Sequence, residues 1–219
     1  MVDRSLLAGV ALFEGLADDA LRVVADSGAS RHLERGDLLF RQGEPADELF
    51  VVVSGRIAIA TRSIDGRESM VALMESGDLF GEMSFFDGRG RSTDARALEP
   101  SEVLSIPFAP LKAALDAQPD ALWHVVELLA GRLRTTDEAL ADSVFLDVPG
   151  RTAKRLLELA GDADEFQLPL TQEELAGLVG ASRERVNKAI AQFIRLGWID
   201  QQERRYKIRD REQLSRRSR

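Results

Sequence analysis

The stretch LTQEELAGLVGASRERVNKAIAQFIRLGWI (Leu170–Ile199) combines two short helical patterns that are separated by a glycine. Thr171 and Glu174 have the spacing of a capping box, which starts a helix. Gly180 allows a tight turn, because glycine adopts positive φ without steric cost. Ser182 is suited to cap a second helix. That helix would bury one face with helical spacing, formed by Val186, Ala189, Ile190 and Phe193.

The segment that follows, WIDQQERRYKI (198–208), reads as a two-stranded hairpin with basic residues. Two helices joined by a tight turn and followed by such a hairpin predict a winged helix-turn-helix. The alternative is an ordinary helical hairpin. Up to Pro149 there are 14 Lys and Arg against 26 Asp and Glu, whereas from Gly150 there are 15 against 11. The overall negative charge argues weakly against nucleic acid, but one basic module is enough to bind it; the alternative is that the asymmetry arises by chance.

Upstream, DVPGR (Asp147–Arg151) is interpreted as a hinge, since proline and glycine interrupt helices, and a new helix is expected from Arg151 to Gly161. Before it, residues Pro119 to Phe145 predict one long helix. Its apolar residues follow a spacing of four and three that is typical of paired helices. They are Leu122, Val126, Leu129, Leu133, Leu140 and Val144, with Thr136 as the polar interruption. We expect a homodimer seam, although the helix could instead lie on the preceding domain.

The first hundred residues contain short strand patterns at intervals of roughly 8 to 12 residues, which favour an antiparallel barrel or roll. LFVVVSGRIAIATR (Leu49–Arg62) is broken by Ser54-Gly55, and Asp65-Gly66 is expected to close a hairpin. Further glycine turns are expected at residues 35–37, 42–44 and 76–78, and a short helix at 18–27. Within this part, LFGEMSFFDGRGRST (Leu79–Thr93) sets Glu82 and Arg91 around a glycine-rich turn in apolar surroundings. They could form a structural ion pair or hold a ligand.

The composition excludes several classes of function. There is no cysteine, which rules out thiolate-held iron–sulfur clusters and thiol nucleophiles, and the two histidines are far apart. We therefore expect no metal site. Neither a catalytic triad nor a phosphate loop of the GxxxxGK[ST] type is present, so we do not expect an enzyme. No apolar run reaches the roughly 18 residues of a membrane span, and the start does not read as a secretory signal, which predicts a cytoplasmic protein.

In this order, the motifs resemble the Crp/Fnr family of cyclic-AMP receptor proteins. The resemblance extends from about Leu7 to the end and rests on FGEMS with RS nine residues after the Glu, FLDVPGR, and TQEELAGLVGASRERVNKA. It implies an α+β protein with three parts: a cyclic nucleotide-binding β-roll over residues 1–118, a dimerisation helix over 119–146, and a winged helix-turn-helix DNA-binding domain over 147–219. It also implies a homodimer that binds double-stranded DNA and acts on RNA polymerase.

The resemblance also implies roles for single residues in the nucleotide site. Glu82 would accept a hydrogen bond from the ribose 2′-hydroxyl, and Arg91 would pair with the cyclic phosphate, which Ser92 would also contact. The complete expected site consists of Gly81, Glu82, Met83, Arg91, Ser92, Thr136 and Asp137. Asp137 departs from the family, which has Ser or Asn there. The expected ligand is cyclic AMP, as an allosteric ligand, with cyclic di-GMP, another nucleotide or no ligand as alternatives.

At the DNA, the resemblance places Arg183, Glu184 and Lys188 at base edges, where Arg and Lys donate to guanine and Glu accepts from cytosine. This favours palindromic sites with GTG-type half-sites. Arg185 replaces a more usual threonine and would add a contact. Phosphate contacts are expected from Thr171, Gln172, Ser182, Lys154, Arg204 and Arg205. The rival functions are a ligand-independent DNA-binding protein and a nucleotide sensor without DNA function.

Overall fold

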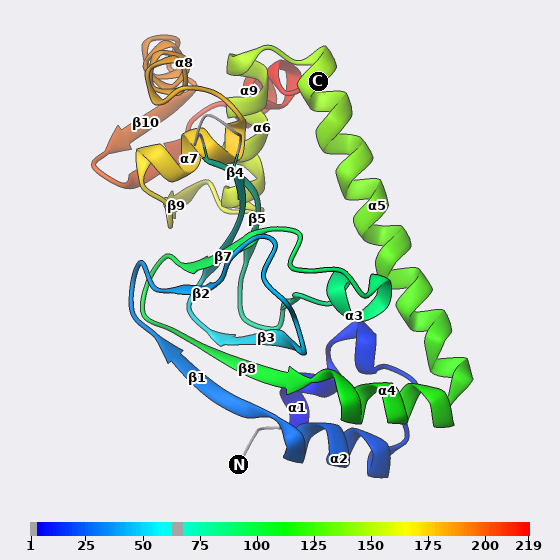
Figure 1. Cartoon of the computed structure of the whole chain (residues 1–219). Coiled ribbons are helices and arrows are strands. Elements are labelled where there is room, and N and C mark those ends of the chain that lie inside the picture. The colour runs from blue at the N-terminus through cyan, green and yellow to red at the C-terminus, as the bar shows by residue number, and fades with distance from the viewer. Residues whose placement is uncertain (1–3, 63–67) are drawn as a thin grey trace. The chain divides into compact units, whose positions relative to one another are not determined.

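The computed structural model describes residues 4–62 and 68–219 of the chain. It divides into two compact units, the first ending at Arg134 and the second beginning at Thr135, within one long helix (Figure 1). Antiparallel strands dominate the first unit and helices the second, which confirms the predicted α+β class. Among the described helices, none is long and apolar enough to cross a bilayer.

Two four-stranded antiparallel sheets build the β-roll of the first unit. One has the order β1-β8-β3-β6, with the bounds Ala29–Leu33, Ser101–Pro107, Glu48–Ser54 and Leu79–Phe80. The other has the order β2-β7-β4-β5, with the bounds Leu38–Phe40, Asp94–Ala97, Ile57–Arg62 and Glu68–Met74. The predicted Asp65-Gly66 turn lies outside the described residues, but β4 and β5 on either side of it pair antiparallel, as a hairpin requires.

The three predicted glycine turns share one geometry. Gly36, Gly43 and Gly77 have φ of 93°, 86° and 93°, the left-handed conformation that glycine adopts most readily. In each turn the acid after the glycine accepts a hydrogen bond from the backbone N–H three residues earlier, as Glu44 does from Arg41 at 2.9 Å. Local sequence therefore fixes these connections before any long-range packing.

The centre of strand β3, from Leu49 to Val53, is apolar because both of its faces are covered. Phe50 and Val52 point between the two sheets, where Phe50 stacks on Phe40 and Phe80 with ring centroids 5.7 and 5.4 Å apart. Leu49 and Val51 point to the opposite face, which the helices cover. These helices are α1 (Arg4–Ala8), η1 (Ala11–Phe13), α2 (Asp18–Ser27) and α4 (Phe108–Ala117). In Figure 1, α2 and α4 lie together beside β1 and β8.

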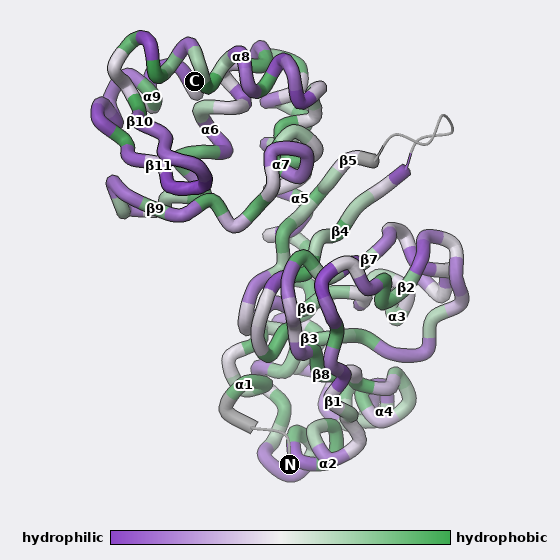
Figure 2. The backbone as a smooth tube through the Cα atoms, turned by 90° about the vertical axis from the view of Figure 1, so that its left-hand side faces the viewer, coloured by the Kyte–Doolittle hydropathy of each residue, from purple (hydrophilic) through white to green (hydrophobic). Residues whose placement is uncertain are grey.

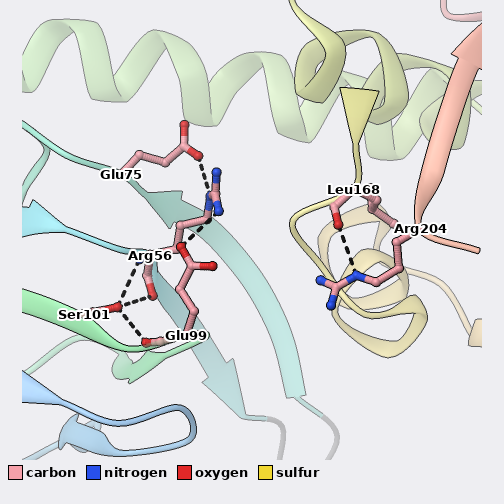
Figure 3. Close-up of polar contacts among 6 residues, drawn as sticks. All are labelled: Arg56, Glu75, Glu99, Ser101, Leu168 and Arg204. Atoms are coloured by element: carbon pink, nitrogen blue, oxygen red, sulfur yellow. Dashed lines mark hydrogen bonds and ion pairs between the residues drawn. The ribbon is translucent and has the colours of Figure 1, made fainter. Parts of the chain in front are cut away.

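The predicted helix at 18–27 matches α2, whereas α1 and α4 were not predicted. Helix α4 has no side-chain cap, because Pro107 occupies its N-cap position, so its start carries no polar signal. The β3–β4 turn is held by Arg56, whose Nε donates to Glu75 at 2.7 Å and whose Nη1 donates to Glu99 at 3.0 Å (Figure 3). Partial burial lowers the pKa of Arg56, but the two carboxylates outweigh it and raise the pKa above its ordinary value.

The predicted long helix begins as the 3₁₀ turn η2 (Pro119–Ala121) and continues as α5 (Leu122–Phe145). Val125 packs into the first unit, but the predicted seam residues of α5 remain exposed in the single chain. Their exposed fractions run from 36% at Leu129 to 67% at Val144. A row of exposed leucines and valines on one helix therefore lacks a cover within the described chain.

The second unit contains α6 (Val148–Ala160), α7 (Gln172–Val179), α8 (Arg183–Arg195) and α9 (Arg211–Arg217), with a three-stranded sheet. The sheet has the order β10-β11-β9, with the bounds Ile199–Gln202, Arg205–Ile208 and Glu165–Gln167. Its strands are mostly hydrophilic in colour (Figure 2). The helix-turn-helix and the hairpin, or wing, that follows it are thus confirmed.

One predicted boundary is wrong: α6 begins at Val148 and not at Arg151. Asp147 is its N-cap and accepts a hydrogen bond from the Gly150 N–H at 2.9 Å. Pro149 fits in the first helical turn because an N–H there would have no helical partner to lose. The presumed helix breaker therefore starts the helix, and only Leu146 and Asp147 separate α5 from α6.

Candidate functional site: a buried cation in the roll and a charged helix face

The short helix α3 (Met83–Asp87) brings the sequence-predicted acid into the roll. Gly81 precedes it with φ of 79°, and a Cβ atom at this position would lie 2.7 Å from Nη1 of Arg91. The Glu82 carbonyl accepts hydrogen bonds from the N–H groups of Phe85 and Phe86 at 3.0 and 3.3 Å. Glycine is thus required at position 81, because the guanidinium of Arg91 lies against the main chain there.

Arg91 is only 5% exposed. Its Nη1 donates to the carbonyl of Gly81 at 3.0 Å and its Nη2 to that of Glu48 at 2.8 Å, while the guanidinium lies 4.2 Å from the ring centre of Phe40. Burial lowers the pKa of Arg91, although the Glu48 and Asp47 carboxylates act in the opposite direction. No carboxylate in the described part of the chain lies within ion-pair distance, and Nε has no hydrogen-bond partner. The roll therefore holds a buried cation that forms no ion pair with the described residues.

Glu82 is 1% exposed, and its Oε1 accepts a hydrogen bond from Nη1 of Arg132 on α5. Nη2 of Arg132 also contacts the carbonyl of Leu79. Glu82 and Arg91 thus do not form the structural ion pair that the sequence left open. Arg132 was missed at the sequence level. Its position four residues before Thr136, on the same face of a helix, was the available signal.

The structure brings five of the predicted nucleotide-site residues together around α3 and the start of β7. Besides Gly81, Glu82 and Arg91, they are Met83 and Ser92, both exposed, with the Ser92 hydroxyl 3.5 Å from the Met83 sulfur. Thr136 and Asp137 lie in the second unit, on an exposed part of α5. Their contact with the same ligand remains a prediction.

In the second unit the predicted helix starts are present atom by atom. Thr171 Oγ1 accepts from the Glu174 N–H at 3.2 Å, and Glu174 Oε2 accepts from the Thr171 N–H at 2.7 Å. Ser182 caps α8, and Gly180 adopts φ of 68° between the helices. The buried face of α8 is the predicted one. Its exposed face carries Arg183, Glu184, Arg185 and Lys188.

Other predicted phosphate-contacting residues have partners inside the module. Gln172 Nε2 donates to the buried hydroxyl of Tyr206 at 2.9 Å. Burial raises the pKa of Tyr206, although the hydrogen bond from Gln172 acts against it. Arg204 Nε donates to the Leu168 carbonyl at 3.3 Å (Figure 3), and Lys154 pairs with Asp142 at 2.5 Å. Arg205 is exposed.

A β-roll with a buried cation that has no ion-pair partner among the described residues, together with a winged helix-turn-helix, defines the class of ligand-sensing DNA-binding regulators. Residues 30–118 match the model of the cyclic nucleotide-binding domain, and residues 150–217 match that of the Crp-like helix-turn-helix domain. The chain is 39% identical to the CRP-like cAMP-activated global transcriptional regulator of Mycobacterium tuberculosis, over 98% of this chain and 99% of that protein.

Two solved structures of similar proteins support the same fold. The catabolite activator protein of Thermus thermophilus is 30% identical, with a TM-score of 0.54 over 95% of this chain and 98% of that one. The c-di-GMP responsive global regulator of Xanthomonas campestris is 24% identical, with a TM-score of 0.76 over 88% and 99%, and supports the fold alone. The chain therefore belongs to the Crp/Fnr family of transcription regulators, and it is not an enzyme.

Proposed function

We propose that this protein is a homodimeric regulator that binds cyclic AMP in the β-roll and, in response, binds palindromic DNA. The single observation that carries the ligand assignment is the buried guanidinium of Arg91, which has no carboxylate partner among the described residues. A buried charge is costly unless it is paired, so the site favours an anion. The Mycobacterium tuberculosis relative, named as cAMP-activated, supports the same ligand.

The residues present fit a cyclic nucleotide. In the described part of the roll, Glu82 Oε2 and Arg91 Nε are both buried without a hydrogen-bond partner. A ribose hydroxyl can donate to the Glu82 carboxylate, and a cyclic phosphate can pair with Arg91 and accept from Ser92. Each charge-assisted hydrogen bond contributes roughly 1.5–3 kcal/mol. Contacts of Thr136 and Asp137 with the base belong to the same proposal.

Isothermal titration with cyclic AMP, cyclic GMP and cyclic di-GMP tests the ligand. We expect Arg91→Ala to raise the Kd for cyclic AMP by about two orders of magnitude and to leave the fold intact. Arg89→Ala is the matched control, because it removes an exposed arginine two residues away. If the wild type binds cyclic di-GMP more tightly than cyclic AMP, cyclic di-GMP becomes the proposed ligand. Equal binding by the wild type and Arg91→Ala would remove the site assignment.

The exposed apolar row of α5 supports the dimer. Contiguous exposed apolar surface on a soluble protein usually marks an interface, and a second α5 helix with the same spacing would cover it. Leu133 is 62% exposed and central in the row. We expect Leu133→Glu to give a monomer in analytical ultracentrifugation, whereas Ala141→Glu, which adds the same charge at an exposed position outside the row, should leave the dimer intact.

The charged face of α8 supports DNA reading, with Arg183, Glu184 and Lys188 at the bases of GTG-type half-sites. Phosphate contacts are proposed for Arg204, Arg205 and the other basic or capping residues named from the sequence. Mobility-shift titrations on a GTG-type palindrome and its single-base variants test this. Arg183→Ala should relax the preference at one base pair of each half-site, by roughly 1–3 kcal/mol. Arg205→Ala should weaken all sequences alike and flatten the salt dependence.

Ligand and DNA binding are coupled only if the nucleotide prefers the DNA-competent state. A switch from 1:99 to 99:1 requires about 5.5 kcal/mol of differential binding. Bound at a promoter in the cytoplasm, the protein would recruit or block RNA polymerase. DNA titration with and without cyclic AMP measures the coupling, and equal affinity in both states would favour a ligand-independent regulator.

A further inference from the structure

Asp94 is a buried carboxylate that the proposed nucleotide site does not use. It is 5% exposed and lies at the first position of β7, three residues after Arg91. Its Oδ1 accepts a hydrogen bond from the backbone N–H of Gln42 at 2.7 Å. Its Oδ2 forms an ion pair with Arg62, whose Nε lies 3.0 Å away, and has no hydrogen-bond partner. Burying a carboxylate is costly, and the hydrogen bond that Asp94 accepts comes from a turn.

That turn spans residues 41–44 and connects β2 to the segment before β3. Gly43 has φ of 86° at its centre, and the Glu44 carboxylate accepts a hydrogen bond from the Arg41 N–H at 2.9 Å. The Asp94 carboxylate accepts a hydrogen bond from the N–H of Gln42, the residue between Arg41 and Gly43. Two carboxylates thus hold consecutive N–H groups of one short turn, one from inside the turn and one from the neighbouring strand.

Turn 41–44 forms hydrogen bonds with both the N–H and the carbonyl of Arg91. The Gly43 N–H donates to the Arg91 carbonyl at 2.8 Å, and the Arg91 N–H donates to the Glu44 carbonyl at 2.8 Å. The approach is close: a Cβ atom on Gly90 would lie only 2.8 Å from the Gly43 carbonyl oxygen. The backbone of the anion-binding arginine is therefore fixed by turn 41–44.

We propose that Asp94 is a positioning residue for the anion site. Through turn 41–44 it fixes the main chain at Arg91 and Ser92, and thereby the guanidinium and the hydroxyl that hold the phosphate. The inference rests on the proposed function, in which these two residues bind a cyclic nucleotide. Because a displaced guanidinium loses a charge-assisted hydrogen bond, we expect Asp94→Ala to raise the Kd for cyclic AMP by about 10- to 100-fold.

The chain supplies a matched control. The turn at residues 34–37 has the same construction: Gly36 has φ of 93°, and Asp37 accepts from the Glu34 N–H at 2.8 Å. It makes the same pair of main-chain hydrogen bonds, at 2.8 and 2.9 Å, but to Ala97 at the far end of β7. Asp37→Ala should therefore loosen an equivalent turn without weakening cyclic AMP binding.

Four variants separate positioning from general destabilisation. Asp94→Ala and Glu44→Ala loosen turn 41–44, and both should weaken cyclic AMP binding, whereas Asp37→Ala should not. Asp94→Asn keeps an oxygen acceptor for the Gln42 N–H and should restore affinity to within about fivefold of the wild type, since roughly 1 kcal/mol or less is then lost. Glu44 is exposed, so its variant remains informative if Asp94→Ala does not fold.

Two readouts respond to position and not to stability alone. The ratio of affinities for the two phosphorothioate diastereomers of cyclic AMP should change in Asp94→Ala, because it depends on where the guanidinium meets the phosphate. In the protein without ligand, hydrogen exchange at the Arg91 N–H should accelerate in Asp94→Ala and remain slow in Asp94→Asn.

The inference is overturned if Asp94→Ala binds cyclic AMP as the wild type does, if its diastereomer ratio is unchanged, or if Asp37→Ala weakens binding equally. Asp94→Asn binding as weakly as Asp94→Ala would overturn the route through the Gln42 N–H. These failures leave the proposed function standing, since the wild type still binds. Absence of cyclic nucleotide binding by the wild type would instead overturn both.

Discussion

Replacing Arg132 by methionine should destabilise the first unit even without ligand, because it leaves the Glu82 carboxylate buried and without its partner. Glu82 is 1% exposed, whereas the Arg132 side chain is 36% exposed. Removing one partner of a fully buried ion pair typically costs 3–5 kcal/mol. Since water reaches more than a third of Arg132, we halve this figure and expect a loss of about 2 kcal/mol.

Methionine retains the apolar volume of the arginine stem, so the variant mainly tests the charge. The double variant Glu82→Gln, Arg132→Met leaves no charge at position 82 or 132 and should recover at least half of the loss. Arg134→Met is the matched control, since Arg134 is exposed two residues further along the same helix. It should lie within about 0.5 kcal/mol of the wild type.

Urea unfolding at pH 7 without nucleotide, followed by far-ultraviolet circular dichroism, measures these differences, and calorimetry should give a Tm lower by roughly 4–8 °C for Arg132→Met. The reasoning is refuted if Arg132→Met and Arg134→Met have the same free energy of unfolding. It is also refuted if the double variant is no more stable than Arg132→Met alone. Either result would mean that Glu82 does not depend on Arg132 for its charge.

Three further predictions concern the fold. Gly55→Ala should lower the free energy of unfolding in urea by at least about 2 kcal/mol, because φ is 82° and the new Cβ would lie 2.7 Å from backbone atoms. Gly36→Ala is the control, since no atom lies within 4 Å of its new Cβ. It should cost only the strain of positive φ, about 1 kcal/mol. Thr171→Ala should destabilise the second unit by about 1 kcal/mol, with Thr171→Ser as its near-neutral control. Partial burial raises the pKa of Asp147, but a main-chain N–H of α6 and the guanidinium of Arg217 outweigh it and hold this pKa below 3.8. The associated stability is present above the unfolded pKa and lost as pH falls through the folded one, so Arg217→Gln should flatten the decline of unfolding free energy between about pH 5 and 2.

Local features were predictable because their hydrogen bonds close within a few residues. The capping box at Thr171 and Glu174, the left-handed Gly180 and the turn at Gly43 each follow from residue type and spacing. The start of α6 was misjudged on the same local scale, since Pro149 is compatible with a first helical turn. Its helix-breaking effect applies only further inside a helix.

Sequence alone determined the α+β class, the identity of the sensor and DNA-binding modules, and the choice of Glu82 and Arg91 as candidates for the proposed ligand site. Only the tertiary structure decided which partners these side chains have. It pairs Glu82 with an arginine fifty residues away, gives Arg91 two carbonyl partners and no ion pair within the described chain, and ties the Arg91 backbone to turn 41–44. Such contacts join residues far apart in the chain, and they form only when sheet order and helix packing bring those residues together, which no local pattern of residue types encodes.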